Sequence, residues 1–107
     1  MNLLFVCSRN RWRSLTAETV FQGKGGHVVR SAGTEENARI RITEGHVGWA
    51  DILFAMEKKH VRRLQEKFSG ALAGKKLICL HIPDEYEYMN DELIGLLQSS
   101  VGEYIEL

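Results

Sequence analysis

Three short runs of consecutive apolar residues constrain the fold of this chain more than any other feature. They cover residues 3–6, 52–56 and 77–80, and none shows the polar alternation of a strand with one wet face. Such runs are typical of strands in a parallel sheet that is covered on both sides. A weaker fourth strand is expected over residues 27–31. The sequence therefore predicts a four-stranded parallel sheet.

Helical patterns fill the intervals between these runs. A first helix is predicted from Ser14 to just before Gly23, and a second over residues 57–68. A third begins after Asn90, which is a favourable N-cap residue. The apolar stripe predicted for this last helix consists of Leu93, Leu96, Leu97, Val101, Tyr104 and Ile105. Strands that alternate with helices predict an α/β fold of three layers, α/β/α.

Length and composition restrict the classes of protein to which the chain can belong. Its 107 residues suit one domain spanning 1–107. Lysine plus arginine equals aspartate plus glutamate, at 14 each, so we expect no binding to nucleic acid or membrane through bulk charge. With two cysteines and no secretory leader, a reduced cytoplasmic protein is expected. Scattered histidines and the lack of a Cys-x-x-Cys pair predict no metal and no other cofactor.

The junction between the first strand and the first helix carries the candidate chemistry. Cys7 ends the strand region, and Arg13 follows after five residues at the start of the helix. A loop of this length can curl around one tetrahedral anion, with backbone N–H groups and the helix dipole directed inward and Arg13 gripping two oxygens. The same surroundings favour a thiolate, which faces bound phosphate as a nucleophile. The alternative is a buried, inert cysteine beside solvated arginines.

Asp84 is the candidate proton donor for such chemistry. A phosphate ester needs an acid to protonate the leaving oxygen and then a base to activate water, and one carboxyl can serve both steps. Asp84 follows Pro83 just beyond the last predicted strand, at the sheet edge to which Cys7 also belongs. The alternative is a surface turn without a catalytic role.

Together, these residues resemble the signature of the low-molecular-weight protein tyrosine phosphatases. In that signature a cysteine, five residues, an arginine and a serine follow the first strand, with an asparagine midway. The matching positions here are Cys7, Asn10, Arg13 and Ser14. Three further stretches occur in the family's order: SAGT at 31–34, WADILFAM at 49–56 and IPDEY at 82–86. The resemblance covers most of the chain.

The resemblance implies a flavodoxin-like fold of the phosphotyrosine phosphatase I kind and a cysteine-dependent phosphatase. The catalytic residues would be Cys7 as nucleophile, Arg13 as phosphate clamp and Asp84 as general acid and base. Positions that bind phosphate or support the loop would be Ser8, Arg9, Asn10, Arg11, Trp12, Ser14 and Ser31, with Tyr86 at the substrate rim. Phosphotyrosine in a protein is the implied substrate; a small phosphomonoester and phosphoarginine stay open, as does the oligomeric state.

The chain departs from the family pattern in several places. Trp12 replaces the second loop cysteine of many relatives, and Asp84 is not followed by proline. Between the SAGT element and the third strand only residues 35–48 remain, where no helix is predicted, so we expect a shortened rim and an open mouth. Arg39 and Arg41 lie in this stretch, and they either reach the mouth or stay in solvent.

Three other classes of protein share parts of this pattern. Arsenate reductases of the thioredoxin-coupled kind need two further cysteines, whereas only Cys79 remains here, and it is expected to be a buried core thiol. A phosphocarrier domain of a sugar transport system needs the loop but not Arg13. A non-catalytic module that binds phosphate or phosphopeptides would keep the loop without turnover. Turnover separates the last class from a phosphatase.

Overall fold

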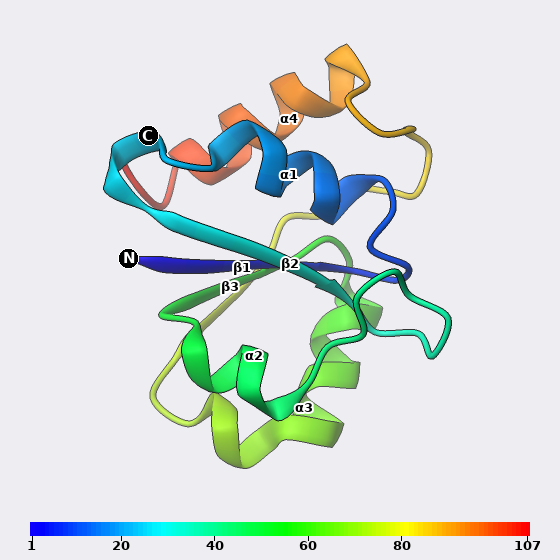
Figure 1. Cartoon of the computed structure of the whole chain (residues 1–107), viewed down its shortest axis with the longest axis vertical. Coiled ribbons are helices and arrows are strands. Elements are labelled where there is room, and N and C mark those ends of the chain that lie inside the picture. Colours follow the sequence, from blue (N-terminus) through cyan, green and yellow to red (C-terminus); the bar gives the residue numbers. More distant parts are fainter.

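A four-stranded parallel sheet forms the centre of the computed structural model, which describes all 107 residues (Figure 1). The strands are β1 (Asn2–Cys7), β2 (Val28–Gly33), β3 (Ile52–Ala55) and β4 (Lys76–Cys79). They lie in the order β2-β1-β3-β4, and every neighbouring pair is parallel. This confirms the sheet predicted from the apolar runs.

Strand β1 is buried on both faces, which explains why its sequence does not alternate. Leu3, Phe5 and Cys7 belong to the core cluster on one side of the sheet. Leu4 and Val6 belong to the cluster on the other side. Because successive side chains of a strand point to opposite faces, both faces of β1 need apolar residues.

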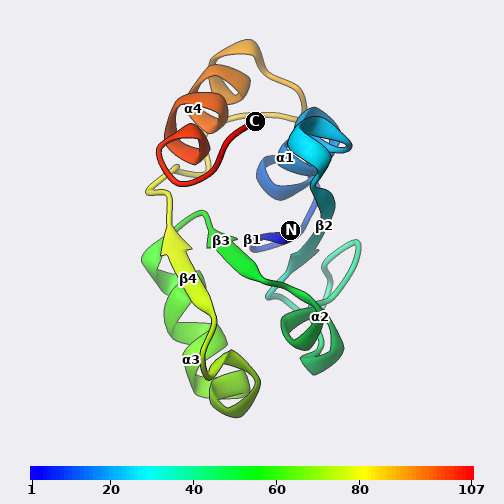
Figure 2. The same ribbon diagram turned by 90° about the vertical axis from the view of Figure 1, so that its left-hand side faces the viewer.

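Helices cover the two faces of the sheet in pairs (Figures 1 and 2). Helices α1 (Arg13–Phe21) and α4 (Asp91–Gly102) lie on one face, and α2 (Glu44–Trp49) and α3 (Lys58–Leu72) on the other. The predicted three-layer architecture is therefore confirmed. Asn90 caps α4 as expected, since its Oδ1 accepts a hydrogen bond from the backbone N–H of Leu93 at 3.1 Å. None of these helices has the length and apolar character needed to cross a membrane.

Helix α2 was not predicted, and its start explains why. The hydroxyl of Thr43 accepts a hydrogen bond from the backbone N–H of His46 at 3.3 Å. In return, the backbone N–H of Thr43 donates to Nδ1 of His46 at 3.0 Å. This is a capping box in which histidine replaces the usual glutamate or glutamine, so the ordinary sequence signature is absent.

Two predicted burial patterns were only partly correct. On α4 the fully buried positions recur every four residues: Leu93, Leu97 and Val101. Leu96, one residue before Leu97, is turned by about 100° around the helix and is 37% exposed. Tyr104 lies beyond the end of the helix and is 50% exposed. Cys79, expected in the core, is half-buried because β4 is an edge strand.

The strand order places a crevice at the carboxyl end of β1. The chain leaves β1 to form β2 on one side and later returns to form β3 on the other. In open α/β sheets, ligands bind where strand order reverses in this way, beyond the carboxyl ends of the strands. Cys7, the last residue of β1, lies at this point.

Candidate active site

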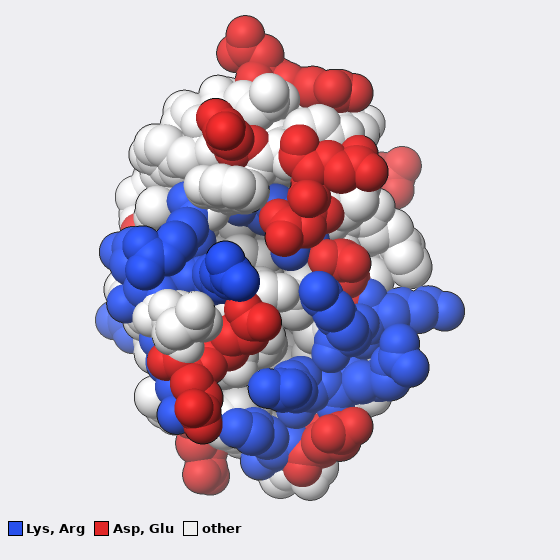
Figure 3. Space-filling model, turned by 90° about the vertical axis from the view of Figure 1, so that its right-hand side faces the viewer, with Lys and Arg blue, Asp and Glu red and all other residues white.

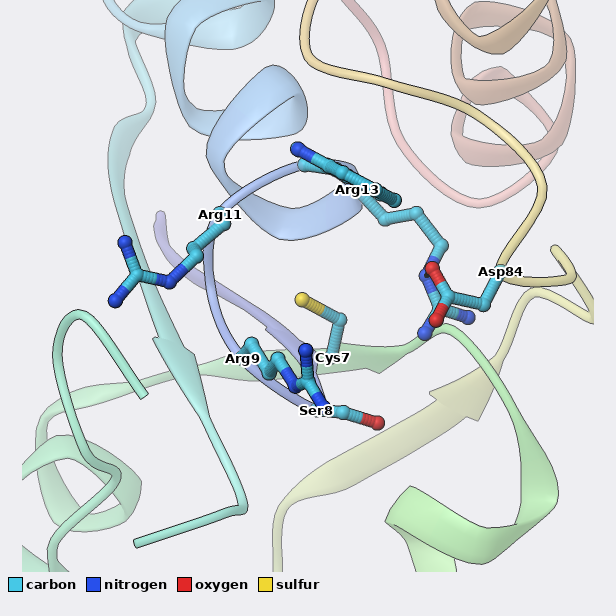
Figure 4. A pocket seen from close by; sticks show the side chains of 7 residues that line it. Cys7, Ser8, Arg9, Arg11, Arg13 and Asp84 are labelled. Atoms are coloured by element: carbon cyan, nitrogen blue, oxygen red, sulfur yellow. Dashed lines mark ion pairs between the residues drawn. The ribbon is translucent and has the colours of Figure 1, made fainter. Parts of the chain in front are cut away.

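The segment between β1 and α1 curves around the sulfur of Cys7, which lies inside the loop (Figure 4). A pocket of about 80 Å³ opens there, which suits one small anion. It is lined by Cys7, Ser8, Arg9, Arg11, Trp12, Arg13 and Asp84. The structure therefore brings the candidate nucleophile, arginine and acid of the sequence analysis to one place.

Two hydrogen-bond donors are directed at the Cys7 sulfur. The backbone N–H of Asn10 donates to Sγ at 3.2 Å. Ser14 Oγ lies 3.0 Å from the same sulfur and accepts a hydrogen bond from Asn10 Nδ2 at 2.7 Å. Because Ser14 already accepts from Asn10, its own proton is free to point at the sulfur. Both contacts stabilise a thiolate at Cys7.

Asn10 holds the loop through its backbone as well as its side chain. Its φ of 56° lies in the left-handed region, which asparagine adopts more readily than most residues. Arg39 braces the same segment from outside: its backbone N–H donates to the carbonyl of Arg9 at 2.9 Å, and its Nε donates to the carbonyl of Asn10 at 3.1 Å. Arg39 therefore contacts the loop backbone and does not line the pocket, so neither alternative considered from the sequence, at the mouth or free in solvent, describes it.

Arg13 is 2% exposed, and its guanidinium is fixed from two sides. Its Nη1 donates to Glu57 Oε1 at 2.5 Å and to the carbonyl oxygen of Ile82 at 2.8 Å. Partial burial opposes ionisation of Glu57, but the hydrogen bond and charge of Arg13 hold the pKa of Glu57 below its ordinary value. With Nη1 occupied, Nε and Nη2 remain for the oxygens of an anion.

A buried histidine supports the first residue of the loop. Nδ1 of His60 accepts a hydrogen bond from the backbone N–H of Glu57 at 3.0 Å. The proton of the neutral ring is therefore on Nε2, which donates to Ser8 Oγ at 2.9 Å. Burial, and then the charge of Arg13, lower the pKa of His60 to about 4, so the ring is neutral near pH 7. The hydroxyl proton of Ser8 is left to donate into the pocket.

Neither Glu57 nor His60 was predicted as a site residue. Residues 57–68 were interpreted only as a helix with an exposed basic face, whereas His60 is 1% exposed. One signal was present in the sequence. Glu57 follows β3 almost directly, so it lies at the carboxyl end of the parallel strands, as Cys7 does.

Asp84 occupies the wall of the pocket beside Arg13 (Figure 4). Its Oδ1 is 3.7 Å from Arg13 Nε, and its side chain is 56% exposed. A carboxyl in this position faces both the pocket and solvent. It can therefore exchange a proton with a leaving group or with water.

The remaining predicted loop residues, Arg9, Arg11 and Trp12, all line the pocket, but their side chains are directed differently. Trp12 lines the pocket and is 44% exposed, so it presents an aromatic surface at the mouth. Arg9 forms an exposed ion pair with Glu35 at 3.2 Å. The side chain of Arg11 points away from the loop in Figure 4.

Two predicted residues lie elsewhere than expected. Ser31, expected among the residues that bind phosphate or support the loop, instead donates its hydroxyl proton to Glu18 Oε1 on α1 at 2.6 Å. Tyr86, expected at the substrate rim, packs against the core cluster beneath α1 and α4 and does not line the pocket. Trp12 is the aromatic residue that lines the pocket.

Several solved structures with the same architecture are phosphatases. The YwlE arginine phosphatase from Geobacillus stearothermophilus is 22% identical, with 95% of this chain and 84% of that chain aligned and a TM-score of 0.63. SP-PTP, a low molecular weight protein tyrosine phosphatase from Streptococcus pyogenes, is 20% identical, with 97% of this chain and 90% of that chain aligned and a TM-score of 0.77. The tyrosine phosphatase Wzb from Escherichia coli K30 is 19% identical, with 96% of this chain and 94% of that chain aligned and a TM-score of 0.75.

The fold is that of the low-molecular-weight protein tyrosine phosphatases. The resemblance noted in the sequence is thus confirmed at the level of the fold. No protein-family model and no curated protein sequence matches the chain. At this degree of identity the low-molecular-weight phosphatase fold does not assign a substrate, and the chemistry has to be argued from the residues of the pocket.

Proposed function

We propose that this chain is a cysteine-dependent phosphatase that hydrolyses a phosphomonoester through a phosphocysteine. The arrangement that carries the proposal is the sulfur of Cys7, which faces two donors inside a loop closed by the buried Arg13. A nucleophile, an anion clamp and an exposed carboxyl converge on one small pocket. The free state of both cysteines suits a reducing compartment, and we propose the cytoplasm.

The first step is attack of the Cys7 thiolate on phosphorus. The S–P bond forms while the bond from phosphorus to the ester oxygen breaks, and Asp84 donates a proton to that leaving oxygen. Arg13 and the backbone N–H groups of the loop stabilise the charge on the phosphoryl oxygens during transfer.

The second step releases phosphate and restores the enzyme. Asp84, now a carboxylate, takes a proton from water as the water oxygen attacks phosphorus and the S–P bond breaks. The departing sulfur again receives the hydrogen bond from Ser14. A phosphorylated active-site serine in a variant of the YwlE phosphatase supports this assignment of the nucleophile.

We further propose that phosphotyrosine in a protein is the substrate. The exposed indole of Trp12 at the mouth offers a stacking surface for an aryl ring. Two of the fold relatives are named as tyrosine phosphatases and one as an arginine phosphatase. Relative kcat/KM on a phosphotyrosine peptide and a phosphoarginine peptide separates the two substrates.

The test of the reaction is hydrolysis of p-nitrophenyl phosphate in the presence of a metal chelator. We expect turnover by the native protein, complete loss in Cys7→Ser, and a loss of about a hundredfold or more in Asp84→Asn. Cys79→Ser is the matched control, because its thiol lies outside the pocket, and it should keep full activity. Full activity in Cys7→Ser would refute the mechanism. Phosphate binding without turnover would instead indicate a binding module.

A further inference from the structure

We propose that a second hollow, between α3 and the segment 34–43, binds acidic residues that flank the phosphorylated residue of a peptide substrate. The inference rests on the proposed function, since it concerns the substrate of the same site. The hollow has a volume of about 370 Å³, far larger than the catalytic pocket of about 80 Å³. It is lined by Thr34, Arg41, Thr43, Arg63 and Lys67 over an apolar floor of Ile42, Leu64 and Phe68.

Three cationic side chains around this hollow have no anionic partner in the protein. Arg41, Arg63 and Lys67 are exposed, and none takes part in any of the four ion pairs of the structure. Thr34 is only 8% exposed, and its hydroxyl forms no hydrogen bond within the protein. Like charges that converge on a hollow repel one another unless an anion lies between them. The lining therefore fits carboxylates.

The hollow adjoins the catalytic pocket through the first residues of the phosphate loop. Thr34 donates its backbone N–H to the carbonyl of Cys7 at 3.0 Å. Leu64 follows His60 by one helical turn, and His60 binds Ser8. A helical turn rises about 5.4 Å, and an extended peptide advances about 3.4 Å per residue. Acidic residues two to four positions from the phosphorylated residue therefore reach the hollow.

The charge around the mouth gives such a peptide a direction. Figure 3 shows most Asp and Glu side chains in the upper half of this face, a smaller basic area at mid-height on the left with some acidic side chains below it, and a continuous basic area at the lower right, over α3. Asp84 lines the catalytic pocket, and Glu85 and Glu87 follow it closely in the chain. Carboxylates of a bound peptide are repelled from that side and attracted to the other, so its acidic segment lies along α3.

The experiment compares three phosphotyrosine peptides of equal length. One carries three glutamates two to four positions before the phosphotyrosine, one carries them two to four positions after it, and one has glutamine in both places. For the native protein we expect kcat/KM to be about tenfold higher on one of the acidic peptides than on the glutamine peptide, because three surface ion pairs form. The preference should shrink as ionic strength rises.

Two triple variants, each of which removes three positive charges, test whether the preference for acidic peptides arises at the hollow. In Arg41→Gln, Arg63→Gln, Lys67→Gln the preference should fall to within about twofold, with activity on p-nitrophenyl phosphate kept. In Lys24→Gln, Arg62→Gln, Lys76→Gln, which removes three exposed cations outside the hollow, the preference should persist. Equal loss in both variants, or no preference in the native protein, would overturn the proposal.

Two further measurements separate the remaining outcomes. If p-nitrophenyl phosphate is not hydrolysed, the proposed function fails, and fluorescence anisotropy of the same three peptides on the native protein still tests the hollow. Equal affinity for all three peptides would then overturn it. A dimer that sedimentation detects in the native protein and not in the first triple variant would assign the hollow to a second copy of the chain, against the proposal.

Discussion

His60 donates its single ring proton to the hydroxyl of Ser8, 2.9 Å away, and thereby links α3 to the phosphate loop. The orientation is set by the backbone N–H of Glu57, which occupies the other ring nitrogen. The link works only while the ring is neutral, because a second ring proton on Nδ1 would face that N–H. Burial and the nearby charge of Arg13 keep it neutral by lowering the pKa of His60 to about 4.

The lowered pKa of His60 predicts how stability depends on pH. As pH falls below about 6.5, the unfolded chain takes up a proton at His60 while the folded protein does not. The free energy of unfolding therefore falls between pH 6.5 and about 4, by about 3 kcal/mol from this residue. Urea unfolding of the native protein and His60→Gln across this range measures the difference. Parallel curves for the two proteins would contradict the assignment.

The parts of the site that the sequence predicted are those that lie close together in the chain. Cys7, Asn10, Arg13 and Ser14 fall within eight consecutive residues between a strand and a helix, so their convergence follows from local structure. The strands could also be predicted from the sequence, because burial on both faces of the sheet leaves an unbroken apolar run in the chain.

The parts that sequence reasoning missed depend on tertiary packing. His60 lies within a helix whose neighbours are charged, and only the approach of the loop shows that its face is buried. The start of α2 was not predicted for a related reason, since histidine replaces the glutamate or glutamine expected in its capping box. The same exchange recurs at Glu57 and His60, where α3 begins. A spacing of three from a cap residue to a histidine is thus a usable signal in this chain.

Removing Glu57 should destabilise the protein because it leaves Arg13 without its closest counter-ion. Arg13 is almost wholly buried, whereas the Glu57 side chain is 31% exposed, so the expected loss is below that of a fully buried pair. We expect Glu57→Ala to lower the free energy of unfolding at pH 7 by about 2 kcal/mol. Glu66→Ala, an exposed position on the same helix without an ion pair, should change it by less than about 0.5 kcal/mol.

The pH dependence of Glu57→Ala tests whether Glu57 stabilises the fold as an ionised carboxylate. Because the pKa of Glu57 is lowered in the folded protein, its contribution is complete above the ordinary carboxyl pKa of 4.5 and is lost as pH falls through the lowered value. Chemical denaturation of the native protein and the variant at pH 7 and near pH 3 measures this. The stability gap between them should narrow at acid pH, and a gap that widens would show that Arg13 is not the partner.

Gly33, the last residue of β2, should tolerate no side chain because the phosphate loop lies against it. A Cβ built there comes within 2.6 Å of the carbonyl oxygen of Ser8 and of Ala38 Cβ. Neither neighbour is the end of a flexible side chain, so the loop backbone itself has to move. We expect Gly33→Ala to cost about 1–3 kcal/mol of stability and to lower kcat on p-nitrophenyl phosphate at least tenfold.

Gly95→Ala is the control, because Gly95 lies in the interior of α4 with no atom near the added Cβ. It should stabilise the fold by about 0.5–1 kcal/mol at unchanged kcat. If Gly33→Ala behaved like that control, the close packing of β2 against the loop would be wrong.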